Sequence, residues 1–294
     1  MTKLLVIWFF EWFWCLSNLI MKPRMLTYDR GLKREIKLKH FDVQAYENSE
    51  KKNFTIKSDF DYMISCELME AANKVNKKIA ILCHGFGRAK YDSIKYALLF
   101  QKLGYTVLMY DHRNHGQSGK AFTTMGHFEK YDLKKLVDWC YEQYGSECRI
   151  VTHGESMGAA TVILHLGIDQ RVKCAISDCG YSDLKLLLCH QMKEFYHLPK
   201  CIIPVESCIA YLRAGFRFKD VSPIKIVSQI ETPILFIHGK CDNLVPPNMS
   251  KQMYAAKKTK KAIYLVAKAR HAESYWKSGE EYERRVEEFL NAYL

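Results

Sequence analysis

Residues 148–166 read CRIVTHGESMGAATVILHL, and this stretch decides the fold. The apolar run 148–154 predicts a buried strand, and the run 159–166 predicts a helix. Between them, residues 154–158 form the pattern G-x-S-x-G at a strand-to-helix turn. The two glycines allow a tight turn that presents the Ser156 hydroxyl at the positive end of the helix dipole. The turn predicts Ser156 as a nucleophile, and a glycine-rich turn with a capping serine is the alternative.

Short apolar runs alternate with helix-period stretches on both sides of this turn. Strands are predicted at 79–85, 105–111 and 148–154, and helices at 91–103 and 131–144. This alternation is typical of an α/β fold with a mostly parallel sheet covered on both faces. The chain has 294 residues and no Pro/Gly/Ser-rich linker, so we expect one domain with an insertion.

A serine nucleophile needs a base to take its proton and an acid to orient that base. The loops after two later strand-like runs offer Asp242 and His271, which follow Ser156 in the chain order typical of G-x-S-x-G enzymes. All three are expected at the carboxyl edge of the sheet. Asp178, which ends an earlier strand-like run, is the alternative acid.

A second glycine-containing turn is predicted directly after the strand that ends at Cys83, where residues 84–87 read HGFG. The glycines let the backbone amide of Phe86 point into the site. Together with the amide of Met157, it is expected to form an oxyanion hole. A simple turn is the alternative interpretation.

Six segments occur in a characteristic order: HGFG (84–87), YDHRNHGQS (110–118), GESMG (154–158), DCGYSDL (178–184), IHGKCDNLVP (237–246) and RHAESY (270–275). From about Phe54 onward the chain resembles the α/β-hydrolase superfamily. It is most similar to bacterial members grouped as esterases or serine aminopeptidase-like lipases, often with an N-terminal hydrophobic segment. Asn114 departs from the arginine–glycine–histidine pattern of these relatives. The loop 111–119 is expected to give structural support, with Arg113 and His115 holding the turn.

The resemblance implies an eight-stranded, mostly parallel sheet whose second strand is antiparallel. The first two strands are expected near 54–56 and 62–68. A helical cap is expected at about 181–229, broken into helices by Pro199 and Pro204. Apolar cap helices over a serine nucleophile suit an acyl chain or aryl group, and packing against the domain is the alternative use of the same faces.

The N-terminal segment 4–21 reads LLVIWFFEWFWCLSNLIM, and residues 22–39 that follow are dense in Lys and Arg. Three arrangements are open: the segment lies in a membrane interface, spans the membrane, or folds back as a lid over the acyl pocket. A basic C-terminal flank predicts a cytoplasmic domain, attached to the inner face of the cell membrane in the first two arrangements. We therefore expect a hydrophobic helix and basic linker in 1–40 and the hydrolase domain in 41–294.

The formal net charge is +12, with a pI near 9.1. No recognition helix or aromatic RNA-reading signature accompanies this charge, so a solvated basic face or a membrane-facing patch is expected and a nucleic-acid partner is not. The eleven cysteines form neither a disulfide framework nor paired CxxC motifs, which favours a reducing compartment and gives no metal site.

The predicted activity is two-step acyl transfer on a carboxylic ester with a small or medium acyl group, such as a monoacylglycerol-like lipid. His271, oriented by Asp242, would take the proton as Ser156 attacks, and no metal or organic cofactor is expected. A peptidase or amidase with the same triad and a non-catalytic, membrane-tethered binding module are the alternatives.

Overall fold

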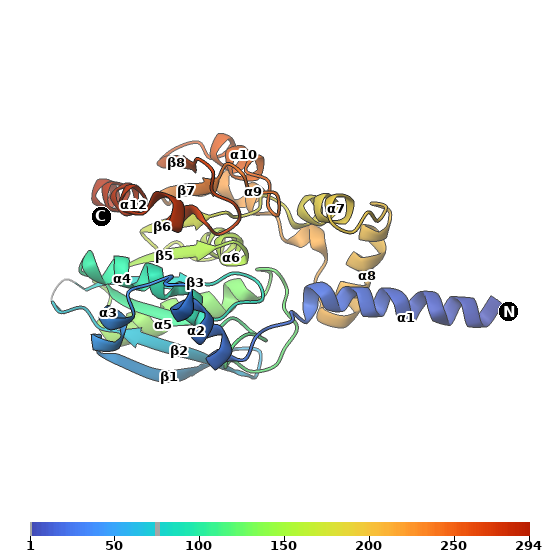
Figure 1. The fold of residues 1–294 in the computed structure, drawn as a ribbon, viewed down its shortest axis with the longest axis horizontal. Coiled ribbons are helices and arrows are strands. Elements are labelled where there is room, and N and C mark those ends of the chain that lie inside the picture. The colour runs from blue at the N-terminus through green and yellow to red at the C-terminus, as the bar shows by residue number, and fades with distance from the viewer. Residues whose placement is uncertain (1, 74–76) are drawn as a thin grey trace.

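The computed structural model describes residues 2–73 and 77–294, with the side chains of the first helix described from Glu11 onward. Eight strands form one sheet in the order β1-β2-β4-β3-β5-β6-β7-β8 (Figure 1). The strands are β1 Lys51–Lys57, β2 Met63–Met69, β3 Lys78–Cys83, β4 Thr106–Tyr110, β5 Arg149–Glu155, β6 Cys174–Asp178, β7 Ile234–Gly239 and β8 Lys261–Val266. β2 pairs antiparallel with β1 and β4, and all other pairs are parallel. The predicted eight-stranded, mostly parallel sheet with an antiparallel second strand is confirmed.

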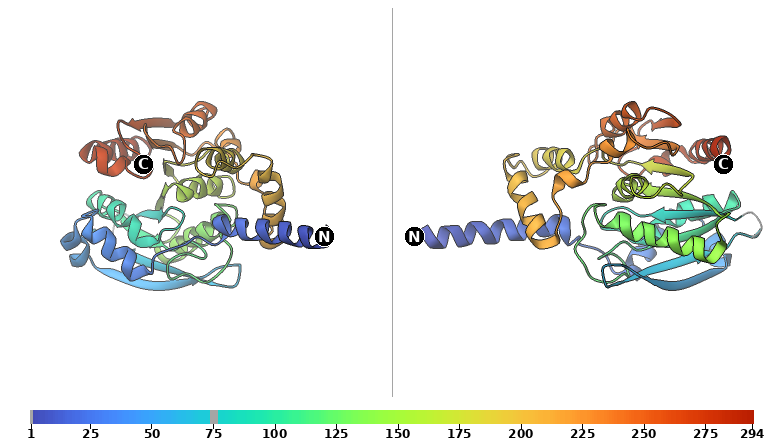
Figure 2. Two further views of the ribbon diagram at one scale, coloured as in Figure 1. Left: turned by 45° about the vertical axis from the view of Figure 1, so that its right-hand side comes forward. Right: turned by 180° about the vertical axis from the view of Figure 1, so that it is seen from behind.

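Helices cover both faces of this sheet (Figures 1 and 2). The helices are α1 Thr2–Met21, α2 Tyr28–Lys37, α3 Val43–Asn48, α4 Ile94–Lys102, α5 Glu129–Tyr144, α6 Met157–Leu166, α7 Leu184–Glu194, α8 Ile202–Ala214, α9 Pro223–Val227, α10 Asn248–Ala256, α11 Ser274–Ser278 and α12 Glu280–Tyr293, with 3-10 turns η2 Lys90–Ser93 and η3 Phe218–Asp220. Apolar side chains of α5, α6, α9 and α10 form the core on one face, and those of α4 and α12 form the core on the other. The strands therefore read as near-continuous apolar runs because both faces are buried.

The turn between β5 and α6 has the tightest backbone packing near the sheet's carboxyl edge. Ser156 there has φ 58° and ψ −112°, and its amide donates to the carbonyl of Asp178 at the end of β6 (2.8 Å). A Cβ added to Gly158 would lie 2.0 Å from the carbonyl oxygen of Cys83 in β3. Only glycine lets the start of α6 approach β3 so closely, and this approach fixes where Ser156 sits.

The cap follows β6 and consists of α7, α8, η3 and α9 (Figure 1). Pro199 lies between α7 and α8, as predicted, and separates the two helices. The prediction that Pro204 also breaks the cap was wrong. Pro204 is in the first turn of α8, where its missing N–H would have had no intrahelical acceptor, so a proline is tolerated.

Helix α1 lies with its C-terminal half against the cap, and its N-terminal half extends beyond it (Figures 1 and 2). Phe13 packs on Ile202 and Ile209 of α8, while the carbonyl of Met21 accepts from the Thr123 amide (3.0 Å). The side chains of residues 4–10, part of the predicted hydrophobic segment, lie outside the described side chains. Within the part of the chain that the structure describes, no helix is long and apolar enough to cross a membrane.

The close approach at Gly158 leads to a stability prediction. The change Gly158→Ala should lower the free energy of unfolding by about 3 kcal/mol or more, because the new methyl group meets backbone that cannot shift without moving β3. Gly104→Ala is the matched control: its Cβ would meet nothing within 4 Å, and φ of +81° predicts a loss of about 1–2 kcal/mol. Urea denaturation of both variants measures the difference, and equal losses would contradict the packing argument.

Candidate active site

Three side chains from different loops form a continuous hydrogen-bonded chain at the carboxyl edge of the sheet. The Nε2 atom of His271 lies 2.9 Å from the Ser156 hydroxyl, and its Nδ1 atom lies 2.8 Å from the carboxylate of Asp242. Ser156 follows β5, Asp242 follows β7 and His271 follows β8. The structure thus brings together the nucleophile, base and acid expected from the sequence, in the order that proton transfer requires.

The carboxylate of Asp242 is buried and fully engaged. Its Oδ1 accepts from the amides of Leu244 and Val245, both at 2.9 Å, and its Oδ2 faces His271 and His238. Burial alone would raise the pKa of Asp242, but the hydrogen bonds from the two histidines hold it at about 2. A charged Asp242 orients the imidazole of His271 with its proton on Nδ1, which leaves Nε2 free to accept the serine proton.

His238 was not among the residues predicted for the site. Its Nε2 atom lies 3.1 Å from the Asp242 carboxylate and 2.9 Å from the carbonyl of Val245, while Nδ1 faces the Ser250 hydroxyl at 2.7 Å. Because Nε2 faces two acceptors, it carries the ring proton. The sequence did offer one signal for His238: it lies in the apolar run that forms β7, and a buried imidazole needs polar partners.

Asp178, the alternative acid, lies in a different environment. Its carboxylate accepts from the Tyr282 hydroxyl at 3.0 Å and faces the Tyr96 hydroxyl at 3.3 Å. No hydrogen bond joins it to His271 among the described residues. The contacts of Asp178 therefore position the end of β6 and, through its carbonyl, the amide of Ser156.

The two residues predicted to supply the oxyanion-hole amides both lie next to Ser156, Met157 in the chain and Phe86 in the same cavity. Met157 is the first residue of α6, so its amide has no acceptor one turn earlier in the helix. Phe86 lies in the turn after β3, and a Cβ built on the preceding Gly85 would be 3.5 Å from the Cβ of Ser156. This turn therefore lies directly against the nucleophile.

The loop 111–119 forms hydrogen bonds with the turn after β3 and with the residues that follow it. His115 accepts the amide of Gly87 on Nε2 (3.1 Å), and Asp111 binds both the amide and the ammonium of Lys90 (2.6 and 3.2 Å). Asn114, at the position where relatives carry glycine, has φ 60°, a conformation that asparagine tolerates. Its side-chain amide donates to the carbonyl of Met21 (3.3 Å), so this loop also holds the end of α1.

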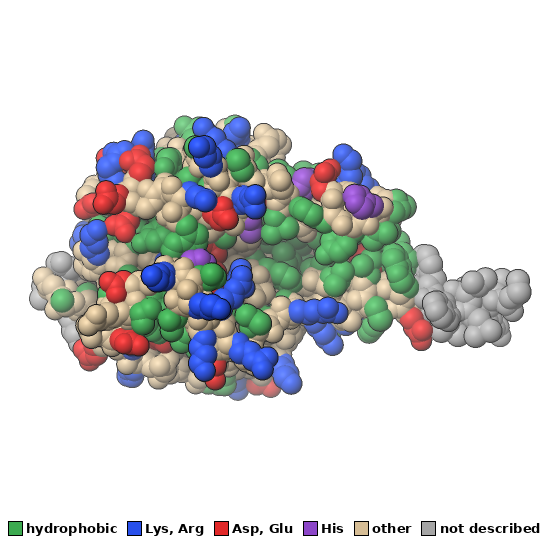
Figure 3. Space-filling model, in the orientation of Figure 1, with side chains coloured by type: hydrophobic (Ala, Val, Ile, Leu, Met, Phe, Trp, Pro, Cys, Tyr) green, Lys and Arg blue, Asp and Glu red, His purple; other side chains and the backbone are tan. Residues whose placement is uncertain are grey.

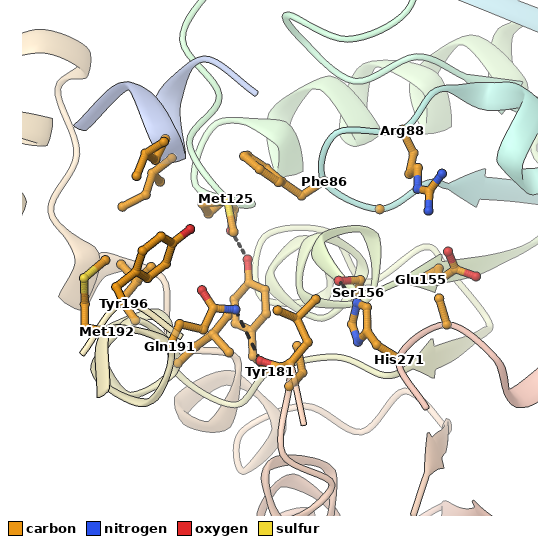
Figure 4. A pocket seen from close by; sticks show the side chains of 18 residues that line it. Phe86, Arg88, Met125, Glu155, Ser156, Tyr181, Gln191, Met192, Tyr196 and His271 are labelled. Atoms are coloured by element: carbon orange, nitrogen blue, oxygen red, sulfur yellow. Dashed lines mark hydrogen bonds between the residues drawn. The ribbon is translucent and has the colours of Figure 1, made fainter. Parts of the chain in front are cut away.

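An apolar cavity of about 340 Å³ opens on one side of Ser156 and His271. Figure 4 shows Met125, Met192 and Tyr196 on this side. Residues of the cap supply part of the wall, including Leu187 and Leu188 of α7. Leu19 and Ile20 of α1 also line it, so the N-terminal helix is part of the cavity, in the place expected for a lid.

A second, polar cavity of about 190 Å³ lies on the other side of His271. It shares Arg88, Glu155, His271 and Ala272 with the apolar cavity, and Figure 4 shows Arg88 and Glu155 opposite the apolar side chains. Its remaining lining residues are mostly charged or aromatic: Arg34, Glu35, His40, Asp92, Lys95, Glu273 and Trp276. Sequence reasoning missed this cavity because its charges come from segments far apart in the chain.

The charged side chains of the polar cavity differ in how closely they are paired. Lys95 and Glu155 are both buried and form an ion pair of 2.8 Å. Burial raises the pKa of the Glu155 carboxyl to about 7, and the ammonium of Lys95 opposes that rise. The guanidinium of Arg88 makes no side-chain hydrogen bond among the described residues and forms only a long ion pair with Glu35 (4.0 Å). Arg88 therefore has donors available to a bound molecule beside Ser156.

One group of metal-ligating side-chain types gathers among the described residues: Cys179, Asp242 and His271, with ligand atoms within 4.8 Å of one another. Both ring nitrogens of His271 are engaged by Asp242 and Ser156. Burial raises the pKa of the Cys179 thiol well above its usual range, which disfavours the thiolate that a metal needs. This chemistry fits proton transfer better than metal binding.

Comparison with known proteins identifies the family of the chain. Residues 91–294 match the prolyl oligopeptidase family. The YqkD protein of Bacillus subtilis is 35% identical over 278 residues, which cover 94% of this chain and 90% of YqkD.

Two solved structures share the fold. The Pyrococcus furiosus esterase Pf2001 superposes with a TM-score of 0.73 at 24% identity, covering 93% of this chain and 98% of the esterase. The α/β hydrolase GrgF from Penicillium sp. sh18 superposes with a TM-score of 0.64 at 17% identity, covering 83% of this chain and 99% of GrgF. With its α/β-hydrolase fold, the chain therefore belongs to the prolyl oligopeptidase family of serine hydrolases.

Proposed function

We propose that this protein hydrolyses carboxylic esters of small or medium acyl groups with Ser156 as the nucleophile. The observation that carries the proposal is the hydrogen-bonded chain Ser156–His271–Asp242, with distances of 2.9 and 2.8 Å, at the junction of an apolar and a polar cavity. An ester of a polyol has an apolar acyl group on one side of the ester linkage and a polar alcohol part on the other, which suits such a junction.

The reaction proceeds in two steps, acylation of Ser156 and hydrolysis of the acyl-enzyme. The Ser156 oxygen forms a bond to the carbonyl carbon while its proton passes to Nε2 of His271, and the imidazolium then protonates the departing alcohol as the ester C–O bond breaks. Water next attacks the acyl-enzyme, gives its proton to His271, and the carboxylic acid leaves as Ser156 regains its proton. The charge on Asp242 stabilises the imidazolium in both steps.

The oxyanion formed in each step needs hydrogen-bond donors that are already in place. The amides of Phe86 and Met157 supply them in this proposal. The position of Met157 at the start of the ten-residue helix α6 adds the favourable end of a helix dipole. The strained backbone of Ser156 aims its hydroxyl at the carbonyl carbon between the two amides.

The two cavities suggest how a substrate is oriented. The acyl group enters the apolar cavity, whose volume of about 340 Å³ suits a short or medium chain. The alcohol part lies toward the polar cavity, where the free donors of Arg88 bind its hydroxyl groups. A monoacylglycerol-like ester has this combination of parts.

Hydrolysis of an amide by the same residues is the second candidate, and one observation favours it. The polar cavity contains Glu35 and Asp92, whose carboxylates could bind a substrate ammonium group. The prolyl oligopeptidase family is named after a peptidase. Cleavage of aminoacyl p-nitroanilides at a higher kcat/KM than p-nitrophenyl esters would favour this candidate over the ester.

The first prediction of this mechanism concerns the nucleophile. A fluorophosphonate probe should label Ser156 alone, and His271→Ala should abolish the label because the hydroxyl loses its base. Mass spectrometry of the labelled protein locates the adduct, and Ser156→Ala should lose nearly all hydrolysis above background. A folded wild-type protein without an adduct would instead favour the non-catalytic binding module.

The second prediction separates the two candidate acids. Asp242→Asn should lower kcat by about a thousandfold to ten-thousandfold, because the amide no longer holds His271 in the required tautomer. Asp178→Asn is the matched control and should lower kcat by less than about tenfold, since its carboxylate contacts tyrosines. Steady-state kinetics on one aryl ester measures both, and the reverse order would assign the role to Asp178.

The third prediction tests the orientation of the substrate. Arg88→Leu should lower kcat/KM for glyceryl monobutyrate by about tenfold or more, the effect of losing hydrogen bonds from a charged donor. Ethyl butyrate carries the same acyl group without the hydroxyls, so its kcat/KM should change little. Equal losses on the two esters would mean that Arg88 supports the fold of the site and does not bind the alcohol part.

A further inference from the structure

The apolar cavity opens to the surface through an apolar mouth. Three residues that line it are also exposed: Leu19 of α1, Tyr196 after α7 and Leu244 after β7, with 43, 49 and 41% of their surface accessible. Figure 3 shows hydrophobic side chains gathered around the hollow on this face. A mouth of this kind lets an acyl chain enter without crossing a polar boundary, and an exposed apolar patch of this kind marks an interaction surface.

The exposed surface continues along α1. Trp12, Leu16 and Leu19 are spaced i, i+4, i+7 and share one side of the helix, and Trp12 and Leu19 are exposed. Phe13 and Ile20, on the neighbouring side, are buried. This apolar side of the helix therefore runs from Leu19 at the cavity mouth to Trp12.

Cations border the same region. Lys22 and Arg24 follow α1 directly, and the exposed Lys193, which forms an ion pair with Glu194 (3.2 Å), is close in sequence to the exposed Phe195 at the end of α7. Figure 3 shows Lys and Arg side chains beside the hollow. The whole chain carries a net charge of +12, so a second copy would bring the same excess positive charge to this surface. Anionic headgroups over an apolar layer complement it, and tryptophan favours such an interface.

We infer that the mouth surface, formed by Trp12, Leu19, Phe195, Tyr196 and Leu244, docks on an anionic lipid surface so that acyl chains pass from the lipid into the cavity. The lipid origin of the substrate rests on the proposed ester hydrolysis. Docking itself does not, since it depends only on the exposed apolar side chains and the cations around them.

Flotation of the full-length protein with vesicles tests this inference. Phosphatidylcholine vesicles with and without one third phosphatidylglycerol are the probes, and binding is expected chiefly to the anionic ones and to weaken as salt rises. Trp12→Ser/Phe195→Ser should lower the bound fraction about fivefold or more, because two exposed aromatic rings no longer insert. Neither residue lines the cavity, so hydrolysis of a water-soluble short-chain ester should stay unchanged.

Two controls keep the result interpretable. Tyr293→Ser removes a comparably exposed ring at the C-terminal end, far from α1 in Figure 1, and should bind vesicles like the wild type. Lys22→Glu/Lys193→Glu leaves the apolar residues in place and should weaken binding to anionic vesicles alone.

Three outcomes would overturn the inference: no flotation of the wild type, unchanged flotation of Trp12→Ser/Phe195→Ser, or a dimer in sedimentation that this double variant abolishes. Flotation without any ester hydrolysis would refute the proposed function alone.

Discussion

The backbone contact between the start of α6 and the end of β3 determines the geometry of the rest of the site. At Gly158 there is no space for a side chain against the carbonyls of Cys83 and His84. The contact sets α6 directly over the sheet, and Ser156 must then take a positive φ to connect β5 to the helix. The same contact brings the turn of Gly85 and Phe86 against the nucleophile. Because the backbone at Gly158 cannot shift, the distance between the proposed oxyanion donors and the Ser156 hydroxyl is fixed.

Around this rigid centre, the buried charged side chains are stabilised by hydrogen bonds from other protein groups more than by water. Asp242 keeps its charge while buried because two backbone amides and two histidines donate to it. His238 is itself held by Ser250, so the orientation of His271 depends on a chain of four side chains that starts in α10. On the opposite side of His271, Lys95 and Glu155 neutralise each other, and Arg88 is left as the available donor. The site is therefore apolar toward the cap and polar toward α2 and η2.

The sequence predicted those parts of the fold and site that depend on local patterns. Ser156, Asp242 and His271 each follow an apolar strand, and parallel strands bring their carboxyl ends to one edge, so their proximity could be foreseen. Arg88 and Lys95 could not be foreseen, because the carboxylates near them lie in other elements and no local pattern pairs them. For His238 the only signal was its place in an apolar strand, which does not say which groups it contacts. Pro204 was misjudged because the boundary of α8 was unknown, and a proline is harmless in a first turn. The three arrangements of residues 4–21 stayed open because hydropathy does not say what a helix packs against.

The place of α1 makes the N-terminal helix part of the cavity wall, and both polar and apolar contacts hold it there. Arg213 of α8 donates to the carbonyl of Trp14 and to Asn18, both at 2.8 Å, as well as to Ser17, and its guanidinium stacks on the Trp14 ring. The apolar side chains of Phe13, Ile20 and Met21 are buried as well, and burial of such a side chain contributes about 1.5–3 kcal/mol. Together these contacts fix the end of α1 against the cap and the loop 111–119. Because Leu19 and Ile20 line the cavity, the position of α1 determines the width of its apolar side, whereas Ser156 and His271 are positioned by the ends of β5 and β8.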